Sequence, residues 1–368
     1  MRYVVLALAL LATPVAAQET VRSQAASYRV EILARGLENP WGVALLPDGR
    51  ALITERPGRL RLFANGALSA PLAGVPEVWA NGQGGLLDVV LDPDFARTGF
   101  VYLTLAGPSG NGALTRLVRA RFDGTALRDS RVLLDAGPAN QAGQHFGARI
   151  VFGRDGMLYM ATGDRGVPER SQRENDLAGK TIRLAPDGRV PPDNPFVGRP
   201  GLRPEIWSTG HRNVQGFAVD PASGALWVSE HGPRGGDELN LIRRGLNYGW
   251  PVVTHGTQYG SGAAIGEGRS KPGMEDPVHA WVPTSPAPSG LAVYDGAAFP
   301  GWRGDLLAGM LQTRAIHRLT LRDGRVVNEE RLIEGQGRIR DVRVGPDGFV
   351  YFLTDAHDGA FGRIVPAN

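Results

Sequence analysis

The stretch NPWGVALLPDGRALITE, from Asn39 to Glu55, contains two apolar runs separated by Pro47-Asp48-Gly49. Asp and Gly tolerate a positive φ, so a Pro-Asp-Gly turn between two apolar runs is typical of a β-hairpin. A small-residue turn precedes the first run. This segment therefore predicts a turn followed by two antiparallel strands.

The same unit returns five more times along the chain. The copies are GGLLDVVLDPDFARTGFVYLTL (84–105), GARIVFGRDGMLYMATGD (147–164), VQGFAVDPASGALWVSE (214–230), SGLAVYDGAAFPGWRGDLLAGML (289–311) and IRDVRVGPDGFVYFLTD (339–355). Six similar units at intervals of tens of residues predict an all-β fold, a six-bladed β-propeller in one domain. A β-sandwich would not need six similar units, and a solenoid would have a shorter and stricter period.

The composition narrows the classes of function. Lys and Arg number 40 against 37 Asp and Glu, and no run of basic residues occurs, so nucleic-acid binding is not expected. The chain has 0 cysteines, which excludes disulfides, thiolate metal sites and cysteine nucleophiles. The sequence also lacks the GxSxG, P-loop and HExxH motifs.

The first residues, MRYVVLALALLATPVAAQET, have the pattern of a secretory signal. A basic residue precedes a short apolar run, and small residues follow it. The run is too short to span a bilayer, and no other segment is long and apolar enough to do so. We therefore expect residues 1–17 to be a cleaved signal peptide and residues 18–368 to form the propeller of a periplasmic or secreted protein.

Polar residues stand at the same place before four of the units. They are Gln83 before the second, His145 before the third, Arg212 and Asn213 before the fourth, and Arg338 and Arg340 at the sixth. Singly, each is an ordinary solvated loop residue. Jointly, they predict a polar, cationic ring around one mouth of the channel. Such arginines suit a ligand with several carboxylates, and a histidine among them can accept a proton near neutral pH.

The stretch SEHGPRGGDELNLIRRGLNYGWPV, from Ser229 to Val252, contains a Gly232-Pro233 turn followed by Asp237-Glu238. A glycine-proline turn can present consecutive backbone carbonyls outward, and such oxygens suit a hard cation such as Ca²⁺. The alternative is a surface turn with two solvated carboxylates.

Six motifs in order, GQGGLLDVVLDPDF, HFGARIVF, ATGDRG, GHRNVQGFAVDP, SEHGPRGGDELNLIRRGLNYGWP and RIRDVRVGPDG, resemble those of the soluble quinoprotein sugar dehydrogenases. The resemblance runs from about Leu37 to Val365. It points to the glucose/sorbosone dehydrogenase type and especially to the compact aldose sugar dehydrogenases. These are six-bladed propellers that use pyrroloquinoline quinone (PQQ) and calcium to oxidise an aldose at C1 to its lactone.

The resemblance also implies roles for individual residues. His145 matches the general base that takes the proton of the C1 hydroxyl as hydride moves to the quinone. The positions that match cofactor contacts are Gln83, Arg212, Asn213, Tyr259, Arg338 and Arg340. The carbonyls of Gly232 and Pro233 match the ligands of the cofactor-bound calcium, and Glu238 and the Tyr248 backbone match a second, structural calcium site.

The sequence departs from the glucose-specific members at two positions. Gln312 stands where they carry a lysine, and Gln144 stands where they carry an acid. By this resemblance, Gln312 removes one cation from the cofactor clamp. The chain is also shorter than the glucose-specific enzymes, chiefly in the loops over the mouth, which predicts a more open sugar site and broad aldose specificity.

Two alternative functions are a calcium-dependent propeller lactonase or other hydrolase, and a non-catalytic propeller that binds a carbohydrate or a protein. The three arginines together favour the dehydrogenase. The physiological sugar, the electron acceptor and the choice between monomer and homodimer stay open at this point.

Overall fold

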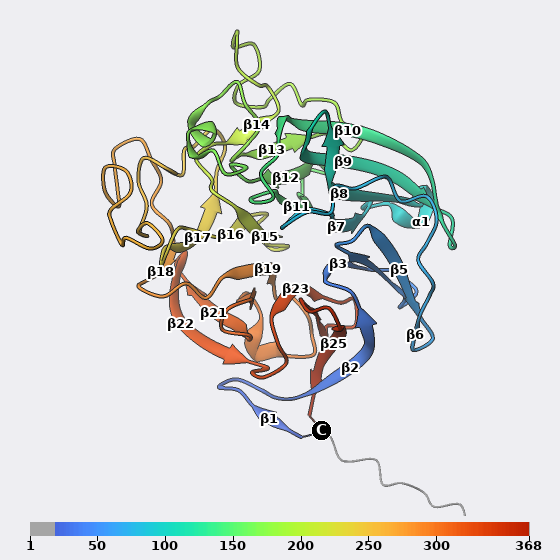
Figure 1. Ribbon diagram of the computed structural model, residues 1–368. Coiled ribbons are helices and arrows are strands. Elements are labelled where there is room, and N and C mark those ends of the chain that lie inside the picture. Colours follow the sequence, from blue (N-terminus) through green and yellow to red (C-terminus); the bar gives the residue numbers. More distant parts are fainter. Residues whose placement is uncertain (1–18, 368) are drawn as a thin grey trace, which may run out of the picture.

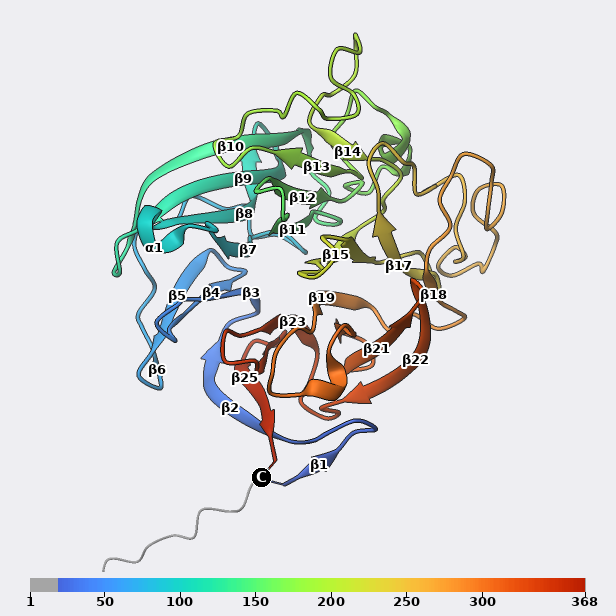
Figure 2. The same ribbon diagram turned by 180° about the vertical axis from the view of Figure 1, so that it is seen from behind.

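The structure is a computed structural model that describes residues 19–367. Six antiparallel sheets stand in a ring around a central axis, as Figure 1 and the reverse view in Figure 2 show. The predicted all-β, six-bladed propeller is thus confirmed. The predicted signal peptide, residues 1–17, lies outside the described residues. Within the described residues, no helix is long and apolar enough to cross a membrane.

The first three blades run in chain order, each from its innermost to its outermost strand. Their strands are β3 (Pro40–Leu45), β4 (Ala51–Glu55), β5 (Arg59–Ala64) and β6 (Ala67–Leu68) in blade 1; β7 (Leu86–Leu91), β8 (Phe100–Ser109), β9 (Gly112–Phe122) and β10 (Leu127–Asn140) in blade 2; and β11 (Gly147–Phe152), β12 (Leu158–Thr162), β13 (Thr181–Leu184) and β14 (Ile206–Ser208) in blade 3. A short helix, α1 (Phe95–Thr98), joins β7 to β8, and a 3₁₀ helix, η1 (Pro168–Gln172), lies between β12 and β13.

The next two blades repeat this order, and the last one combines both ends of the described chain. Their strands are β15 (Val214–Val219), β16 (Leu226–Glu230), β17 (Asp237–Ile242) and β18 (His279–Trp281) in blade 4; β19 (Pro288–Val293), β20 (Leu306–Met310), β21 (Ile316–Arg322) and β22 (Arg325–Leu332) in blade 5; and β23 (Ile339–Val344), β24 (Val350–Thr354), β25 (Gly359–Pro366), β2 (Ser27–Leu37) and β1 (Val21–Arg22) in blade 6. The 3₁₀ helix η2 (Pro300–Trp302) precedes β20.

Each repeated sequence unit holds the two innermost strands of one blade. All six innermost strands carry a register shift against the second strand near their start, as between Pro40 and Val43 in blade 1 or Ile339 and Asp341 in blade 6. A β-bulge bends a strand and re-aims the side chains beside it. The residues within these bulges include Trp41, Gln215 and Arg340, which line the cavity described below.

In blades 1, 2 and 4, a hydroxyl group on the second strand fastens the blade to the next one. The hydroxyl of Thr54 in β4 donates to the carbonyl of Leu87 at 2.5 Å, and that of Thr104 in β8 donates to the carbonyl of Ala148 at 2.7 Å. Ser229 in β16 makes the equivalent bond to Ser289 at 3.1 Å. Because these side chains are fully buried, each bond satisfies a carbonyl that a bulge has removed from the strand ladder.

We expect Thr104→Val to lower the free energy of unfolding by about 1–3 kcal/mol, because the isosteric change leaves the buried carbonyl of Ala148 without its donor. Urea unfolding followed by tryptophan fluorescence measures the loss. Thr125→Val, in an exposed turn, is the matched control. Equal stability of the two variants would contradict a role for Thr104 in joining the blades.

Charged side chains fill the centre of the ring. One equivalent position of the innermost strands carries Asp88, Arg149 and Asp341 in three blades and glycine in the others. The guanidinium of Arg149 lies 3.2 Å from Asp88 and 2.8 Å from Asp341, and Arg343 pairs with the same two carboxylates. A Cβ at Gly42 would lie 2.7 Å from Asp88 Oδ1, so glycine leaves room for the cluster.

Candidate functional site

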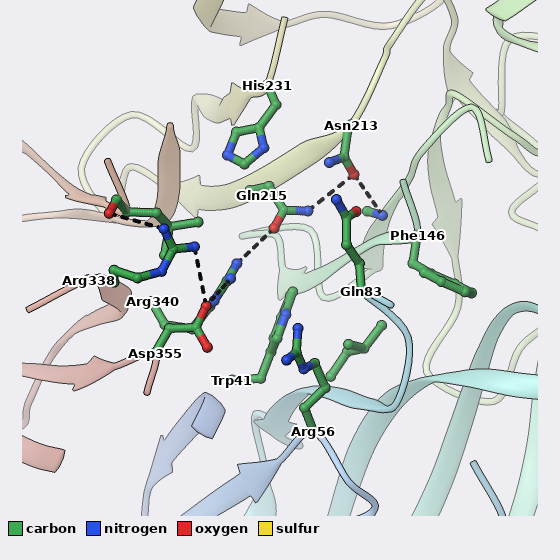
Figure 3. Close-up of a pocket in the computed structure, with 13 residues that line it drawn as sticks. Trp41, Arg56, Gln83, Phe146, Asn213, Gln215, His231, Arg338, Arg340 and Asp355 are labelled. Atoms are coloured by element: carbon green, nitrogen blue, oxygen red, sulfur yellow. Dashed lines mark hydrogen bonds and ion pairs between the residues drawn. The ribbon is translucent and has the colours of Figure 1, made fainter. Parts of the chain in front are cut away.

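A cavity of about 570 Å³, continuous with solvent, opens at one mouth of the channel (Figure 3). Residues from all parts of the ring line it: Trp41, Arg56, Gln83, Leu87, Phe146, Gly147, Asn213, Gln215, His231, Leu311, Arg338, Arg340 and Asp355.

The blade geometry explains why residues so distant in sequence meet here. The first two strands of a blade are antiparallel, so the start of the first and the end of the second reach the same mouth. Gln83, Asn213 and Arg338 come just before or at the first strand of a blade. Arg56, His231, Leu311 and Asp355 each follow the last residue of a second strand.

Three arginines surround one carboxylate on one side of the cavity. Arg340 lies 2.6 Å and Arg338 lies 3.6 Å from Asp355, with Arg56 nearby. Burial by itself would raise the pKa of Asp355, but the charge and hydrogen bond of Arg340 hold that pKa well below its usual range. Asp355 is therefore ionised, and three cations against one anion leave this wall with an excess of positive charge.

The floor of the cavity is a chain of hydrogen bonds that crosses the ring. Arg340 donates to the side-chain oxygen of Gln215 at 3.0 Å, and Gln215 donates to that of Asn213 at 3.2 Å (Figure 3). The same Asn213 oxygen accepts the backbone N–H of Gly147 at 3.2 Å. These polar groups hold one another in place before any ligand arrives.

His231 presents a neutral imidazole at the cavity. Its Nε2 donates to the carbonyl of Pro288 at 2.7 Å, so Nδ1 carries the lone pair. Burial, reinforced by the charges of Arg340 and Arg212, lowers the pKa of His231 to about 3. This ring is therefore a hydrogen-bond acceptor at neutral pH.

His145 lies beside the cavity, adjacent to the lining residue Phe146. Its Nδ1 is 2.7 Å from Oδ1 of Asp164, and its backbone N–H donates to Gln83 at 2.8 Å. Burial would raise the pKa of Asp164, but the hydrogen bond and charge of His145 and the donors of Gly166 and Trp250 lower it overall. Asp164 is therefore a carboxylate that keeps the proton on Nδ1, which leaves Nε2 of His145 as the basic atom.

Arg212 lies behind His231. Its side chain donates to the carbonyl of His231 at 3.0 Å and its guanidinium lies 5.3 Å from the ring centre of Trp250. Burial lowers the pKa of Arg212. Its Nε is buried and has no hydrogen-bond acceptor among the described residues. It is therefore an unsatisfied buried donor.

The buried Gly232-Pro233 turn is held in place by Asp237. Asp237 accepts the backbone N–H of Gly232 at 3.0 Å and that of Ala287 at 2.9 Å. A Cβ at Gly232 would lie 1.7 Å from the carbonyl oxygen of Gly236, so only glycine fits. In residues 19–367, neither the Gly232 nor the Pro233 carbonyl accepts a hydrogen bond. Two adjacent backbone oxygens are thus left without a donor from the described residues.

Glu238 and Tyr248 sit in a separate acidic region. Burial and the neighbouring carboxylates, first of all Glu230, raise the pKa of Glu238 to about 8. The Tyr248 hydroxyl is used internally, because it donates to the carbonyl of Leu241 at 2.6 Å. In the described part of the chain, no three His, Asp or Glu side chains are grouped to hold a metal ion, so any cation here needs backbone oxygens as well.

Tyr259, Gln312 and Gln144, which the sequence analysis singled out, are not among the residues that line the cavity. Tyr259 is 67% exposed on the loop between β17 and β18 and does not line the cavity. Gln312 is exposed, while its neighbour Leu311 is the lining residue. Gln144 is exposed beside His145, and its side chain packs near Gly166.

The structure adds residues that the sequence reasoning missed. Arg56, Trp41, Gln215, His231 and Asp355 line the cavity, and Asp164 with Trp250 supports His145. The sequence contained a signal for three of them. Arg56, His231 and Asp355 each directly follow the second strand of their blade, so they occupy equivalent positions. The predicted ring of polar residues rested on the starts of the units alone.

The fold and the site together define a class of protein. It is a six-bladed β-propeller in which arginines line one mouth of the central channel beside a histidine–aspartate pair. A sequence model of the glucose/sorbosone dehydrogenases matches residues 37–363, and the chain belongs to that family.

Individual relatives cover almost the whole chain. It is 44% identical to the aldose sugar dehydrogenase YliI of Escherichia coli over 93% of its length and 94% of that protein. The crystal structure of a glucose dehydrogenase matches at 48% identity, with a TM-score of 0.89 over 92% of this chain and 99% of that one. The PQQ-bound aldose sugar dehydrogenase of Streptomyces coelicolor matches at 32% identity and a TM-score of 0.76, over 92% and 98%.

Proposed function

We propose that this protein oxidises aldose sugars at C1 to the lactone, with PQQ and Ca²⁺ as cofactors and His145 as the general base. The observation that carries the proposal is the juxtaposition of two features. One is an arginine-rich cavity; the other is a histidine whose Nδ1 is held by a buried carboxylate and whose Nε2 has no hydrogen-bond partner among residues 19–367. The family membership supports it.

The cavity fits a polycarboxylate such as PQQ, which has three carboxyl groups. Arg56, Arg338 and Arg340 would hold those groups against a single competing anion, Asp355. The Nε of Arg340 is buried and, within the described residues, unpartnered, as is that of Arg212. A buried donor without an acceptor costs free energy, so an anionic ligand that reaches it recovers that cost. Gln83 and Asn213 would add polar contacts.

The Gly232-Pro233 turn fits a hard cation, since it offers two adjacent carbonyl oxygens without protein donors. When bound, PQQ supplies the acceptor for the hydride from C1, and Ca²⁺ supplies Lewis acidity. Glu238 and the Tyr248 backbone would contribute to a second calcium ion. An added dication would offset the negative charge that raises the pKa of Glu238.

The protein's own task at the reacting carbon is to move one proton. Nε2 of His145 would accept the proton of the sugar C1 hydroxyl. Asp164 would stabilise the resulting imidazolium and keep the ring oriented, because it holds Nδ1 at 2.7 Å. Gln83 fixes the backbone of the base through its bond to the His145 N–H. The neutral His231 would add no positive charge opposite the base.

The hydrolase alternative is less well supported by the centre of the ring. A propeller lactonase would need a metal held by side chains there, whereas Arg149 and Arg343 already neutralise Asp88 and Asp341 at that point. Lactone hydrolysis is therefore the comparison assay, and sugar binding without turnover is the second one.

Reconstitution tests the proposal. The mature chain is chelated, and dye reduction is followed with several aldoses after adding PQQ, Ca²⁺, both, or neither. We expect activity only with both, over hexoses, pentoses and disaccharides alike. Lactone hydrolysis without PQQ would replace the dehydrogenase with the hydrolase, and one sharply preferred sugar would refute the broad specificity.

A cofactor-binding prediction concerns Arg338, whose side chain is 43% exposed and only loosely paired. Arg338→Met should weaken PQQ binding by roughly 10–100-fold, the equivalent of one charge-assisted hydrogen bond. Isothermal titration of PQQ into the calcium-loaded protein gives the affinity. Arg314→Met, at an exposed arginine outside the cavity, controls for general charge, and equal affinities in both variants would remove Arg338 from the binding set.

We also propose export to the periplasm or the medium. N-terminal sequencing of the protein from those fractions should find Gln18 as the first residue. A protein that keeps residues 1–17 and stays in the cytoplasm would overturn this.

A further inference from the structure

Asp164 is held by two different groups, and only one of them is the candidate base. Oδ1 contacts His145 Nδ1 at 2.7 Å and accepts the backbone N–H of Gly166 at 2.8 Å. Oδ2 accepts the indole N–H of Trp250 at 2.8 Å. We propose that Trp250 is a positioning residue that orients Asp164 and sets the proton affinity of His145. The effect of Trp250 on catalysis rests on the proposed function, whereas its effect on His145 does not.

Trp250 is fixed from both sides of its backbone. Its N–H donates to the carbonyl of Gly210 at 3.0 Å, and its carbonyl accepts the Gln172 amide at 2.7 Å. The side chain is only 8% exposed. The indole therefore has little freedom to follow Asp164, and Asp164 is constrained by the indole.

The indole also faces a cation. The Arg212 guanidinium lies 5.3 Å from its ring centre, a cation–π distance. Trp250 thus contacts both a predicted cofactor-binding arginine and the carboxylate behind the predicted base. One side chain from the segment that follows β17 links these two parts of the site.

The direction of the effect follows from the charges around the pair. The charged or titratable groups that face it are Arg165 beside Asp164, Arg212 before β15, and His231 after β16. The indole N–H is a neutral donor, and it spreads the negative charge of Asp164 away from His145. Without it, the carboxylate presents more negative potential to the imidazole. The imidazolium is then favoured, and the pKa of His145 rises.

Trp250→Phe removes the N–H and keeps most of the ring. In the cofactor-free protein, the histidine ¹³Cε1 NMR signals are titrated with pH, and His145→Asn identifies the His145 signal. We expect Trp250→Phe to raise the pKa of His145 by roughly half a pH unit or more. In the reconstituted enzyme, the acid limb of kcat/KM should move the same way.

Two comparators make the result specific. Asp164→Asn removes the charge and should lower the pKa of His145, the opposite direction. Trp207→Phe is the matched control, because Trp207 Nε1 is buried without an acceptor among the described residues and packs on Tyr159, outside the cavity. Trp207→Phe should leave the titration of His145 unchanged.

The outcomes separate this inference from the proposed function. A raised pKa of His145 in Trp250→Phe supports the inference even if the wild-type protein fails to oxidise any sugar. An unchanged titration, while Asp164→Asn shifts it, overturns the inference even in an active dehydrogenase. If Trp250→Phe does not fold, benzothienylalanine at position 250 keeps the ring size without the N–H and decides the question in the same way.

Discussion

Replacing His145 with asparagine is expected to reduce kcat by about 10²–10⁴-fold, the usual contribution of a general base. The affinity for PQQ should stay unchanged, because the side chain of His145 points to Asp164 and does not line the arginine wall. Asparagine is the substitution of choice, since His145 has a φ of +54° and asparagine tolerates that conformation better than alanine. Steady-state dye reduction and PQQ titration on the same preparations measure both quantities.

His357→Asn provides the control, because the His357 side chain is 89% exposed and does not line the cavity. It should match the wild type in both assays. A His145→Asn enzyme with near-normal turnover would assign the proton transfer to another group. A loss of PQQ binding equal to the loss of turnover would place His145 in the cofactor contacts instead.

Arg149→Met is expected to lower the free energy of unfolding by about 3–5 kcal/mol, because it breaks a buried ion-pair cluster. Arg149 is 1% exposed and links its own blade 3 to blades 2, 4 and 6. It forms ion pairs with two carboxylates and donates to the carbonyls of Gln215 at 2.7 Å and Arg340 at 2.8 Å. Its loss leaves the two buried carboxylates with Arg343 as their remaining ion-pair partner among the described residues. Chemical unfolding at neutral pH measures the effect.

The stability lost in Arg149→Met should be larger at neutral pH than at acidic pH. Burial raises the pKa of Asp88, against the opposing charges of Arg343 and Arg149. Without Arg149 the folded-state pKa rises further above the unfolded value, so the folded state binds protons more tightly. Stability of the variant should therefore increase as the pH falls from 7 toward 5, relative to the wild type.

Arg97→Met, which breaks an exposed pair with Asp94, should change stability little at either pH. If Arg149→Met lowers stability only slightly and without pH dependence, the central cluster stabilises the ring by packing and not by charge compensation.

The blade pattern could be predicted from sequence because its signals are local. Turns such as Pro47-Asp48-Gly49 and Pro346-Asp347-Gly348 fix a hairpin within a few residues, and six copies then imply a ring. The composition of blade 6 could not be predicted that way. β2 pairs with β25, which lies at the other end of the chain, so no local turn in the sequence predicts this pairing.

The site was predictable where it follows the same local rule. Gln83, Asn213 and Arg338 could be found because they enter innermost strands, and the structure brings them to one cavity. Arg56 and Asp355 reach the same cavity from the ends of second strands, which depends on the antiparallel geometry. Trp250 could not be found, because it comes from an irregular loop whose path only tertiary packing determines.

The sharing of blade 6 between the two ends has a consequence for how the molecule is made. Arg363 in β25 pairs with Glu31 in β2 across a separation of 332 residues. A chain synthesised or translocated from its N-terminus presents β2 long before its partner exists, so ring closure is the last assembly event. Loss of β25 would leave β2 as an open edge, ready to pair with another copy and aggregate.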